Sequence, residues 1–540
     1  MRSTRRFRLT KASKILIFIL VVSLLGGVVF AGLKTGVVKT NSDKKESVSE
    51  NKNDYNDNNN TISADEDGNV INTDKSDDKT INISLDEWIG WKEIIDSNGG
   101  LTTQPGSIYD KLGINVNISI INDATQSSNA LISGSLDAAG YTVNRTAFLS
   151  NKFLEAGVDV VMPYITNFSN GGDGIIAKSS ITSVTDLVNA KIGVPQFSEA
   201  HSLVVWFVNQ SDLTEEEKQQ IINNLIFFET PDEAAKAFFA GQIDVAATWE
   251  PYLTQAQNMS DAHILFSTAS SSSLIMDGIL FNKEFVDKYP EVVTAFIDGA
   301  LQGADLYETD MTSIKKVMPM FSTSSDEDII ANCQSAKLMT YADNMNVLNG
   351  TAKSIYTSMC DVWSSVGENV NKDIVDDIFD DTLISTLASK YDQNDVTETD
   401  ANVTITEENK QEAIDAEALL QKSATVNFIV STAKFTDAAE ATQTLDEFID
   451  IAKVLDGTII EIAGNTDPNP DIDPDDTANK MLSQQRAETV KQYFVLNGIS
   501  PDRIVVVGNG SSNPVVDNDT PEHRAMNRRT DVSFKCLERE

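Results

Sequence analysis

The sequence predicts two α/β parts behind an N-terminal transmembrane helix, and three observations lead to this prediction. An uncharged, apolar run of 19 residues lies at positions 15–33. From residue 81 to residue 391, short β-prone runs alternate with amphipathic helical segments, which is typical of an α/β domain. A second alternation of strand and helix patterns begins at residue 426, after a polar, acidic stretch. The length of 540 residues also favours two or three folded units.

The N-terminal segment predicts a single-pass membrane anchor. Residues 1–14 carry six Arg or Lys and no acid, and the run at 15–33 is long enough as a helix to cross a bilayer core of about 30 Å. A basic flank stays in the cytoplasm, so the bulk of the chain is expected on the periplasmic or cell-wall side of the cell membrane. The alternative is a cleaved signal peptide, because residues 29–31 resemble a cleavage site. Residues 34–80 are acidic and poor in large apolar side chains, which predicts a disordered linker.

Composition excludes several classes of function. The formal net charge of −39 argues against nucleic acid as a partner. Cys333, Cys360 and Cys536 show no metal-ligand spacing, and the three histidines are scattered, so no metal and no cofactor are expected. Cys333 and Cys360 are expected to be buried free thiols, with a disulfide between them as the alternative. The motifs of serine hydrolases, P-loop proteins and zinc proteases do not occur, so the chain is not expected to be an enzyme.

Two near-repeats suggest that residues 81–391 form two similar lobes. Residues 130–139 and 237–246 each read as the end of a helix, a glycine, and a short strand that starts at an aspartate. Glycine suits the left-handed conformation that often follows a helix C-terminus. Two copies of this unit predict two similar α/β lobes.

With its other motifs, this region resembles the type II periplasmic solute-binding proteins, in the nitrate/taurine/sulfonate and thiamine-precursor branch. The stretches that carry the resemblance are Trp88-Ile89-Gly90-Trp91, the two Gly-x-x-Asp units, and residues 185–194, 247–252 and 288–293. The resemblance implies a fold of two lobes, with lobe one at 81–176 and 277–385 and lobe two at 177–276. It also implies the substrate-binding component of an ABC-type importer for a small anionic or sulfonate-like solute, with a transporter permease as partner.

By this resemblance, solute contacts come from loops at strand ends and from helix N-termini, where N–H groups favour anions. The candidate solute-binding residues are Trp88, Trp91, Thr125, Ser198, His201, Trp249 and Glu250. Trp88 and Trp91 fit a hydrophobic core equally well, and a histidine such as His201 is more often a surface or capping residue. Ser198 also precedes an apolar run and is expected to cap a helix. Arg145 either pairs with an anionic ligand or stands at an exposed helix start.

A linker is expected at 392–425, with a helical segment up to residue 422, and a separate α+β domain at 426–540 that starts with a strand at 426–431. This domain resembles the OmpA/Pal-type peptidoglycan-binding domain. The motifs that carry the resemblance are Gly464-Asn465-Thr466-Asp467, residues 479–490, Gly498-Ile499, Arg503, Gly508-Asn509-Gly510, Pro514 and residues 527–532.

The resemblance implies binding of a diaminopimelate-type stem peptide. Such a stem presents an ammonium and carboxylates on one residue, so Asp467 is expected to take the ammonium and Arg486 a carboxylate through its fork. The other residues expected at this site are Asn479, Leu482, Ser483 and Arg528. The alternative is a surface salt bridge between Asp467 and Arg486.

Two departures from the family pattern accompany this site. Asn465 stands where the family often has histidine, and residues 468–476 enlarge the loop after Asp467. This loop alternates acids as a calcium loop does, but it lacks the glycine and the closing glutamate, so a solvated loop is expected. For the whole chain, the competing function is a structural envelope tether whose central lobes bind a protein or no ligand.

Overall fold

The computed structural model describes two folded domains and a short strand pair. The described residues are 62–64, 70–72, 79–397, 403–416, 418–424, 428, 432, 433, 435, 438–468, 473 and 475–536. The predicted membrane segment, 15–33, lies outside them, and among the described helices none has the length and apolar character needed to cross a bilayer. Strands β1 (Ile62–Ala64) and β2 (Val70–Asn72) pair antiparallel inside the segment predicted to be a disordered linker.

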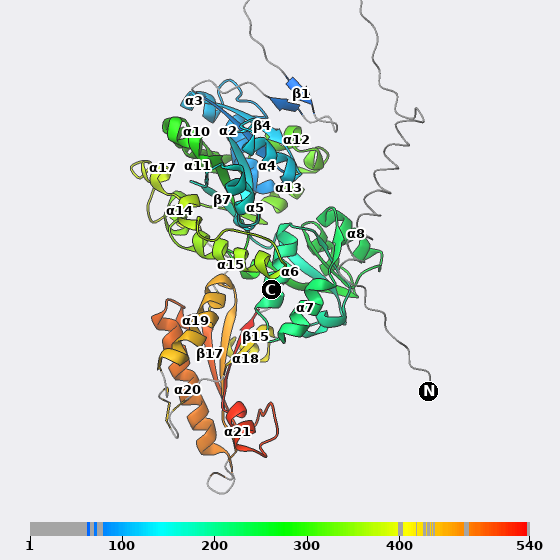
Figure 1. Ribbon diagram of the computed structural model, residues 1–540, viewed down its shortest axis with the longest axis vertical. Coiled ribbons are helices and arrows are strands. Elements are labelled where there is room, and N and C mark those ends of the chain that lie inside the picture. The colour runs from blue at the N-terminus through cyan, green and yellow to red at the C-terminus, as the bar shows by residue number, and fades with distance from the viewer. Residues whose placement is uncertain are drawn as a thin grey trace, which may run out of the picture. The chain divides into compact units, whose positions relative to one another are not determined.

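The first lobe is built on a mixed sheet whose principal strand order is β4-β3-β5-β13-β7-β14. Strands β4 and β7 mark this lobe in Figure 1. Its strands are β3 (Thr80–Leu85), β4 (Asn115–Ile120), β5 (Ala138–Thr142), β6 (Val160–Val161), β7 (Ile165–Ser169), β13 (Met276–Asn282) and β14 (Ala336–Leu338). Strand β3 runs parallel to both β4 and β5, whereas β13 runs antiparallel to β5 and β7. Strand β13 is the segment that returns from the second lobe.

The second lobe repeats this arrangement in a five-stranded sheet of order β10-β9-β11-β8-β12. Its strands are β8 (Asp173–Lys178), β9 (Ile192–Pro195), β10 (Ile226–Phe228), β11 (Val245–Trp249) and β12 (Ala262–Ser267). Strand β9 is parallel to β10 and β11, and β8, which arrives from the first lobe, is antiparallel to β11 and β12. The shared strand order gives a two-lobed periplasmic-binding-protein-like fold.

The point where the chain enters the second lobe differs from the predicted one. Because β8 belongs to the second sheet, residues 173–176 lie in lobe two and not in lobe one. The apolar residues of this strand fit either sheet, and only the ladder with β11 and β12 assigns it. Gly134 and Gly241, the glycines of the two near-repeats, both have φ of 71° and both follow a helix and precede a strand, as predicted.

Helices cover both sheets. Those of the first lobe are η1 (Ile89–Trp91), α2 (Lys92–Asn98), α3 (Ile108–Leu112), α4 (Ala124–Ile132), α5 (Val143–Ala156), α10 (Lys283–Lys288), α11 (Pro290–Gly303), η4 (Ala304–Leu306), α12 (Thr312–Val317), η5 (Pro319–Phe321), α13 (Asp326–Cys333), α14 (Tyr341–Val347), α15 (Thr351–Ser365), α16 (Val375–Ile378) and α17 (Thr382–Ser385). Those of the second lobe are η2 (Val184–Asn189), α6 (Glu199–Asn209), α7 (Glu215–Asn223), α8 (Pro231–Phe239), α9 (Tyr252–Gln257) and η3 (Thr268–Ser270). Ser198 caps α6 by accepting a hydrogen bond from the His201 N–H, as predicted. Cys333 and Cys360 are buried free thiols, also as predicted, whereas Cys536 is exposed.

The C-terminal domain has a four-stranded sheet of order β15-β18-β16-β17. Its elements are α18 (Lys410–Asp415), β15 (Ala418–Ala424), α19 (Ala438–Val454), β16 (Ile459–Asn465), α20 (Thr477–Leu496), η6 (Pro501–Arg503), β17 (Ile504–Gly510), α21 (Pro521–Asn527) and β18 (Thr530–Lys535). Strand β15 pairs with β18 where the sequence predicted a linker and helix, because the ladder and the burial of Leu420 outweigh the helix propensity of this segment. Most of the strand predicted at 426–431 lies outside the described residues.

Candidate functional sites

A small, partly open cavity lies between the two lobes. Its walls come from the ends of β3, β5, β8, β11 and β13 and from the first turns of α5 and α6. The lining residues are Asp86, Trp88, Trp91, Gly140, Tyr141, Thr142, Arg145, Asp173, Glu199, Trp249, Ile275 and Asp277. In α/β sheets the space beyond the strand ends is the usual place for a ligand.

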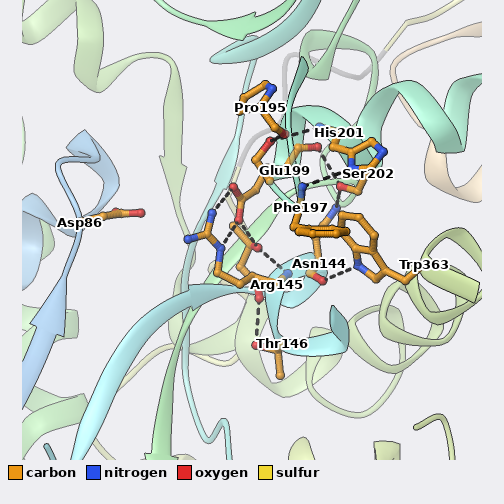
Figure 2. A network of polar contacts seen from close by, with 12 residues as sticks. Asp86, Asn144, Arg145, Thr146, Pro195, Phe197, Glu199, His201, Ser202 and Trp363 are labelled. Atoms are coloured by element: carbon orange, nitrogen blue, oxygen red, sulfur yellow. Dashed lines mark hydrogen bonds and ion pairs between the residues drawn. The ribbon is translucent and has the colours of Figure 1, made fainter. Parts of the chain in front are cut away.

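One ion pair joins the lobes across this cavity. Arg145, in α5 of the first lobe, donates from Nε to Glu199 Oε1 at 2.9 Å and from Nη2 to Oε2 at 2.7 Å (Figure 2). Glu199 is the first residue of α6 in the second lobe, and it also accepts a hydrogen bond from the Thr142 hydroxyl. Such a two-pronged contact is a strong form of charge-assisted hydrogen bond. The only guanidinium that lines the cavity is therefore engaged by a carboxylate of the protein.

Three aspartates in the cavity lack a cationic partner of this kind. Asp277 accepts a hydrogen bond from the Trp88 indole at 3.0 Å, Asp86 one from the Trp91 indole at 2.6 Å, and Asp173 one from the Ser169 hydroxyl at 2.7 Å. Each of these bonds uses one carboxylate oxygen. In Figure 2 the Asp86 carboxylate points toward the Arg145 guanidinium, but no contact joins them.

Burial changes the protonation of these acids. It raises the pKa of Asp173 to about 7, with the charges of Glu199 and Asp86 adding to the shift. It also raises the pKa of Asp277 well above the usual range and raises that of Asp86. Burial opposes ionisation of Glu199 too, but the Arg145 guanidinium outweighs it and holds the Glu199 pKa below its usual value. The cavity thus contains acids whose ionisation is opposed by burial.

Aromatic rings make up much of the remaining wall. Trp88, Trp91, Tyr141 and Trp249 all line the cavity, and the two indole N–H groups named above orient two of its acids. Gly90 permits this arrangement, since a Cβ there would lie 2.5 Å from Trp88 Nε1 and 2.4 Å from Asn167 Nδ2. A side chain at Gly90 would therefore push Trp88 off Asp277.

The structure brings Trp88, Trp91 and Trp249 together at this cavity, and it places the other four predicted solute-binding residues elsewhere. Thr125 is exposed at the start of α4. Glu250 accepts hydrogen bonds from the backbone and hydroxyl of Thr254 and does not line the cavity. Ser198 is occupied in capping α6 and donating to the Pro195 carbonyl.

His201 lies in the packing between the lobes and not in the cavity. It is 2% exposed, and its ring meets Trp363 edge-on at 5.4 Å (Figure 2). Its Nδ1 accepts a hydrogen bond from the Phe197 N–H, and burial lowers its pKa to about 4, so the ring is neutral near pH 7. Nearby, Asn144 donates to the Ser202 hydroxyl and Phe148 stacks on Phe197, so α5 and α6 also pack together beside the ion pair.

Sequence reasoning missed most of the charged residues of the cavity. Asp86, Asp173, Glu199 and Asp277 stand in no motif, and Arg145 was considered without its partner. The one signal that pointed to any of them is position: Asp86 directly follows β3 and Asp173 begins β8. That signal needs correct strand ends, which are the least reliable part of a sequence-based assignment.

The C-terminal domain has a second candidate site beside the loop after β16. Asp467 Oδ2 lies 3.2 Å from Arg528 Nη1, and both side chains are partly exposed. Arg486, which is 6% exposed, donates from Nε to the Thr432 carbonyl and lies over the Phe428 ring at 4.9 Å. Burial and the charge of Arg528 lower the Arg486 pKa, while Asp467 acts in the opposite direction, so the three charges lie close enough to interact.

The other predicted residues of this site support the loop and the helix. The side chain of Asn479 donates a hydrogen bond to Asp476. The Asp473 carboxylate accepts hydrogen bonds from the N–H groups of Ala478 and Asn479, in the first turn of α20. Ser483 is buried and accepts a hydrogen bond from the Gly510 N–H, and Leu482 is half-buried. Asp473 is therefore occupied, and the described residues contain no group of acids, His or Cys able to hold a metal ion. Residues 469–472 and 474 of the enlarged loop lie outside them.

Two neighbouring residues complete the description of this domain. Arg529 is buried and pairs with Asp531 through two hydrogen bonds of 2.9 and 2.8 Å, so its role is structural. Asn465, which stands where histidine was expected, is buried and joins Asp531 to Asn509 through its amide. A histidine is not required for that bridge, because the amide supplies both a donor and an acceptor.

Comparison with known proteins agrees with both domains. Residues 105–309 match the family described as NMT1/THI5 like, and residues 427–528 match the OmpA family. The chain carries an NMT1/THI5-like domain followed by an OmpA family domain. The OmpA domain is 50% identical over 79 residues to outer membrane porin F of Pseudomonas fluorescens, which is 15% of this chain and 23% of that protein. It is also 50% identical over 54 residues to the peptidoglycan-binding protein ArfA of Mycobacterium tuberculosis, which is 10% of this chain and 17% of that protein.

The NMT1/THI5-like domain has similar solved structures. The periplasmic aliphatic sulphonate binding protein SsuA of Escherichia coli is 15% identical, with a TM-score of 0.45 and coverage of 56% of this chain and 99% of that one. The periplasmic nitrate-binding protein NrtA of Synechocystis PCC 6803 is 13% identical, with a TM-score of 0.42 and coverage of 58% of this chain and 88% of that one. The chain spans half or less of the length of the curated relatives it matches, and 23% and 17% of the two named above.

The raised acid pKa values predict how the stability of the NMT1/THI5-like domain changes with pH. The pKa of Asp173 is about 7 in the folded chain, against an ordinary 3.8. The contribution of Asp173 to the stability of the fold is therefore complete below pH 4 and is lost as the pH rises through 7. At about 1.4 kcal/mol per pKa unit, the loss is at most about 4 kcal/mol. We expect Asp173→Asn to reduce the fall in the melting temperature of the chain between pH 4 and pH 8, while Asp277 and other buried acids keep part of it.

The matched control is Asp244→Asn in the same lobe. A hydrogen bond and ion pair with Lys178 and a hydrogen bond from the Lys191 N–H lower the pKa of Asp244, so this acid stabilises the fold above its ordinary pKa. Its replacement should lower the melting temperature at pH 8. If Asp173→Asn and the unsubstituted chain have the same melting temperature at every pH, Asp173 does not have a raised pKa in the folded chain.

The Arg145–Glu199 pair predicts how the lobes are held together. Removal of one partner leaves a buried, unpaired charge, which commonly costs about 3–5 kcal/mol. We expect Arg145→Gln to shift the NMT1/THI5-like domain toward an open form, measured as a larger radius of gyration by small-angle X-ray scattering. Lys353→Gln, which removes the more exposed pair with Asp376, is the control and should leave the radius of gyration unchanged. Equal scattering from all three proteins would show that the pair does not hold the lobes.

Proposed function

We propose that this protein is an extracytoplasmic solute-binding protein fixed to the cell envelope through its OmpA domain. The NMT1/THI5-like domain captures a small solute in the cavity between its lobes, and the OmpA domain binds peptidoglycan. The solute is passed to an ABC-type permease, and the apolar run at 15–33 anchors the chain in the membrane. This arrangement holds the NMT1/THI5-like domain close to both the membrane and the cell wall.

Wall binding is supported chiefly by the charges around Asp467. A diaminopimelate-type stem offers an ammonium and carboxylates on one residue, and here one carboxylate lies beside two guanidinium groups, those of Arg486 and Arg528. Asp467 suits the ammonium, and the arginines suit carboxylates. The Asp467–Arg528 pair is partly exposed, so a ligand is able to compete for it. One relative of this domain is named for peptidoglycan binding.

Solute capture is supported by the cavity itself. It lies between two lobes of the same strand order and is crossed by an ion pair that a hinge motion would break. The combination of a lined cavity, a few polar groups and aromatic walls is typical of small-molecule sites. The competing function, an envelope tether without a ligand, does not account for three buried or half-buried aspartates facing an open cavity.

Peptidoglycan binding is tested by co-sedimentation. Asp467→Ala and Arg486→Ala should each weaken the affinity for purified diaminopimelate-type peptidoglycan by about tenfold, because a lost charged contact is worth roughly 1.5–3 kcal/mol. A smaller fraction of the full-length chain should therefore sediment with it. Lys453→Ala, an exposed cation on α19, is the control and should sediment normally. Normal sedimentation of both site variants would contradict the roles of these residues.

Solute capture is tested by isothermal titration calorimetry of the full-length chain. The panel contains taurine, methanesulfonate, nitrate, phosphate, pyrimidines and small organic ammonium compounds. We expect one compound class to bind with a stoichiometry of one, and Trp249→Ala to weaken that binding by about tenfold through loss of a wall of the cavity. Binding of no member of the panel would favour the tether without a ligand.

A further inference from the structure

The cavity between the lobes is lined by more acids than cations. Four carboxylates and one guanidinium line it, and the guanidinium is bound at two nitrogens by Glu199. Asp277 and Asp173 are only 3% and 6% exposed, and each has one oxygen bonded to a neutral donor. Burial favours the protonated form of both acids, and a cation bound in the cavity would favour their ionised form.

The rest of the wall is suited to the same kind of ligand. Trp88, Trp91, Tyr141 and Trp249 offer aromatic faces or edges to the cavity. The face of an aromatic ring attracts a cation, and the attraction reaches about 2 kcal/mol or more at a desolvated site. The Trp88 and Trp91 indoles also hold Asp277 and Asp86 in place, so rings and acids form one preorganised unit.

We infer that the cavity binds a small organic cation, a compact ammonium compound that meets Asp277, Asp173 and Asp86 with its charge and the tryptophans with its apolar groups. The inference rests on the proposed solute-binding function and names its class of substrate. It replaces the small anionic or sulfonate-like solute expected from the sequence.

An anion fits this cavity poorly. It would have to displace Glu199 from Arg145 and would then face three aspartates whose direct partners are neutral donors. A metal ion is also disfavoured, because the described residues contain no group of three potential ligands close enough to hold one. An organic cation needs neither change, since it is contacted by carboxylates and aromatic faces at larger spacings.

The experiment compares the sign of the ligand charge. Tetramethylammonium, choline and putrescine are titrated into the full-length chain by calorimetry at constant ionic strength, beside taurine, methanesulfonate and nitrate. We expect at least one cation to bind at one site and the three anions to show no binding. Tetramethylammonium has no titrating group, so its affinity should rise between pH 5.5 and pH 8 as the protein groups around it lose protons.

The titrating groups of the cavity are Asp173, Asp277 and Asp86. They are faced by Tyr141 of β5, Arg145 of α5 and Glu199 of α6. Asp277→Asn and Asp173→Asn keep the shape of the side chain and remove its charge, and each should weaken cation binding at least tenfold. Asp244→Asn, outside the cavity, should bind as the unsubstituted chain does. Melting curves of all variants show whether the NMT1/THI5-like domain remains folded.

Three results would overturn the inference. Binding of an anion without binding of any cation would reverse the class of substrate but leave solute capture intact. Binding of neither class would contradict both solute capture and the cation. Cation binding that is unchanged in folded Asp277→Asn and Asp173→Asn proteins would place the cation outside this cavity.

Discussion

The contact between Arg145 and Glu199 governs both the shape and the charge of the NMT1/THI5-like domain. It spans the two lobes, and it uses the only guanidinium of the cavity to balance an acid of the protein. The pair bridges the lobes beside the packing of α5 on α6, and it leaves Asp173 and Asp277 without a cation in direct contact. Burial opposes the ionisation of these two acids, because it removes water that would solvate their charge.

In the OmpA domain, most of the buried charged groups are paired with each other. Asp531, Arg529 and Asn465 form a closed, buried set of hydrogen bonds that leaves no charge for a ligand. Beside it, the partly exposed pair of Asp467 and Arg528 lies near Arg486, whose guanidinium rests on Phe428. Two guanidinium groups and one carboxylate lie there, and the Asp467–Arg528 pair is the partly exposed part of the set. The two candidate sites of the chain therefore have opposite charge.

Local patterns predicted the framework well. The glycines that end a helix before β5 and β11, the serine that caps α6 and the three tryptophans of the cavity were all identified from short stretches of sequence. Each depends on neighbours within a few residues or on a motif of fixed spacing. Thr125, Ser198, His201 and Glu250 were placed in the solute site on the same local grounds, and the structure gives them other contacts. A helix start or a strand end has several possible neighbours, and the sequence does not show which one is met.

By itself the sequence determined the order of the domains, their α/β character and the motif residues around Asp467 and Arg486. These features are carried by periodicity, turn residues and contiguous motifs, all of which are short-range. Only the tertiary structure decided the charge of the solute cavity, because Asp86, Arg145, Asp173, Glu199 and Asp277 come from five separate elements on two lobes. Whether a carboxylate is paired or left for a ligand depends on distances of a few ångström across that cleft, and those distances exist only once both lobes are folded.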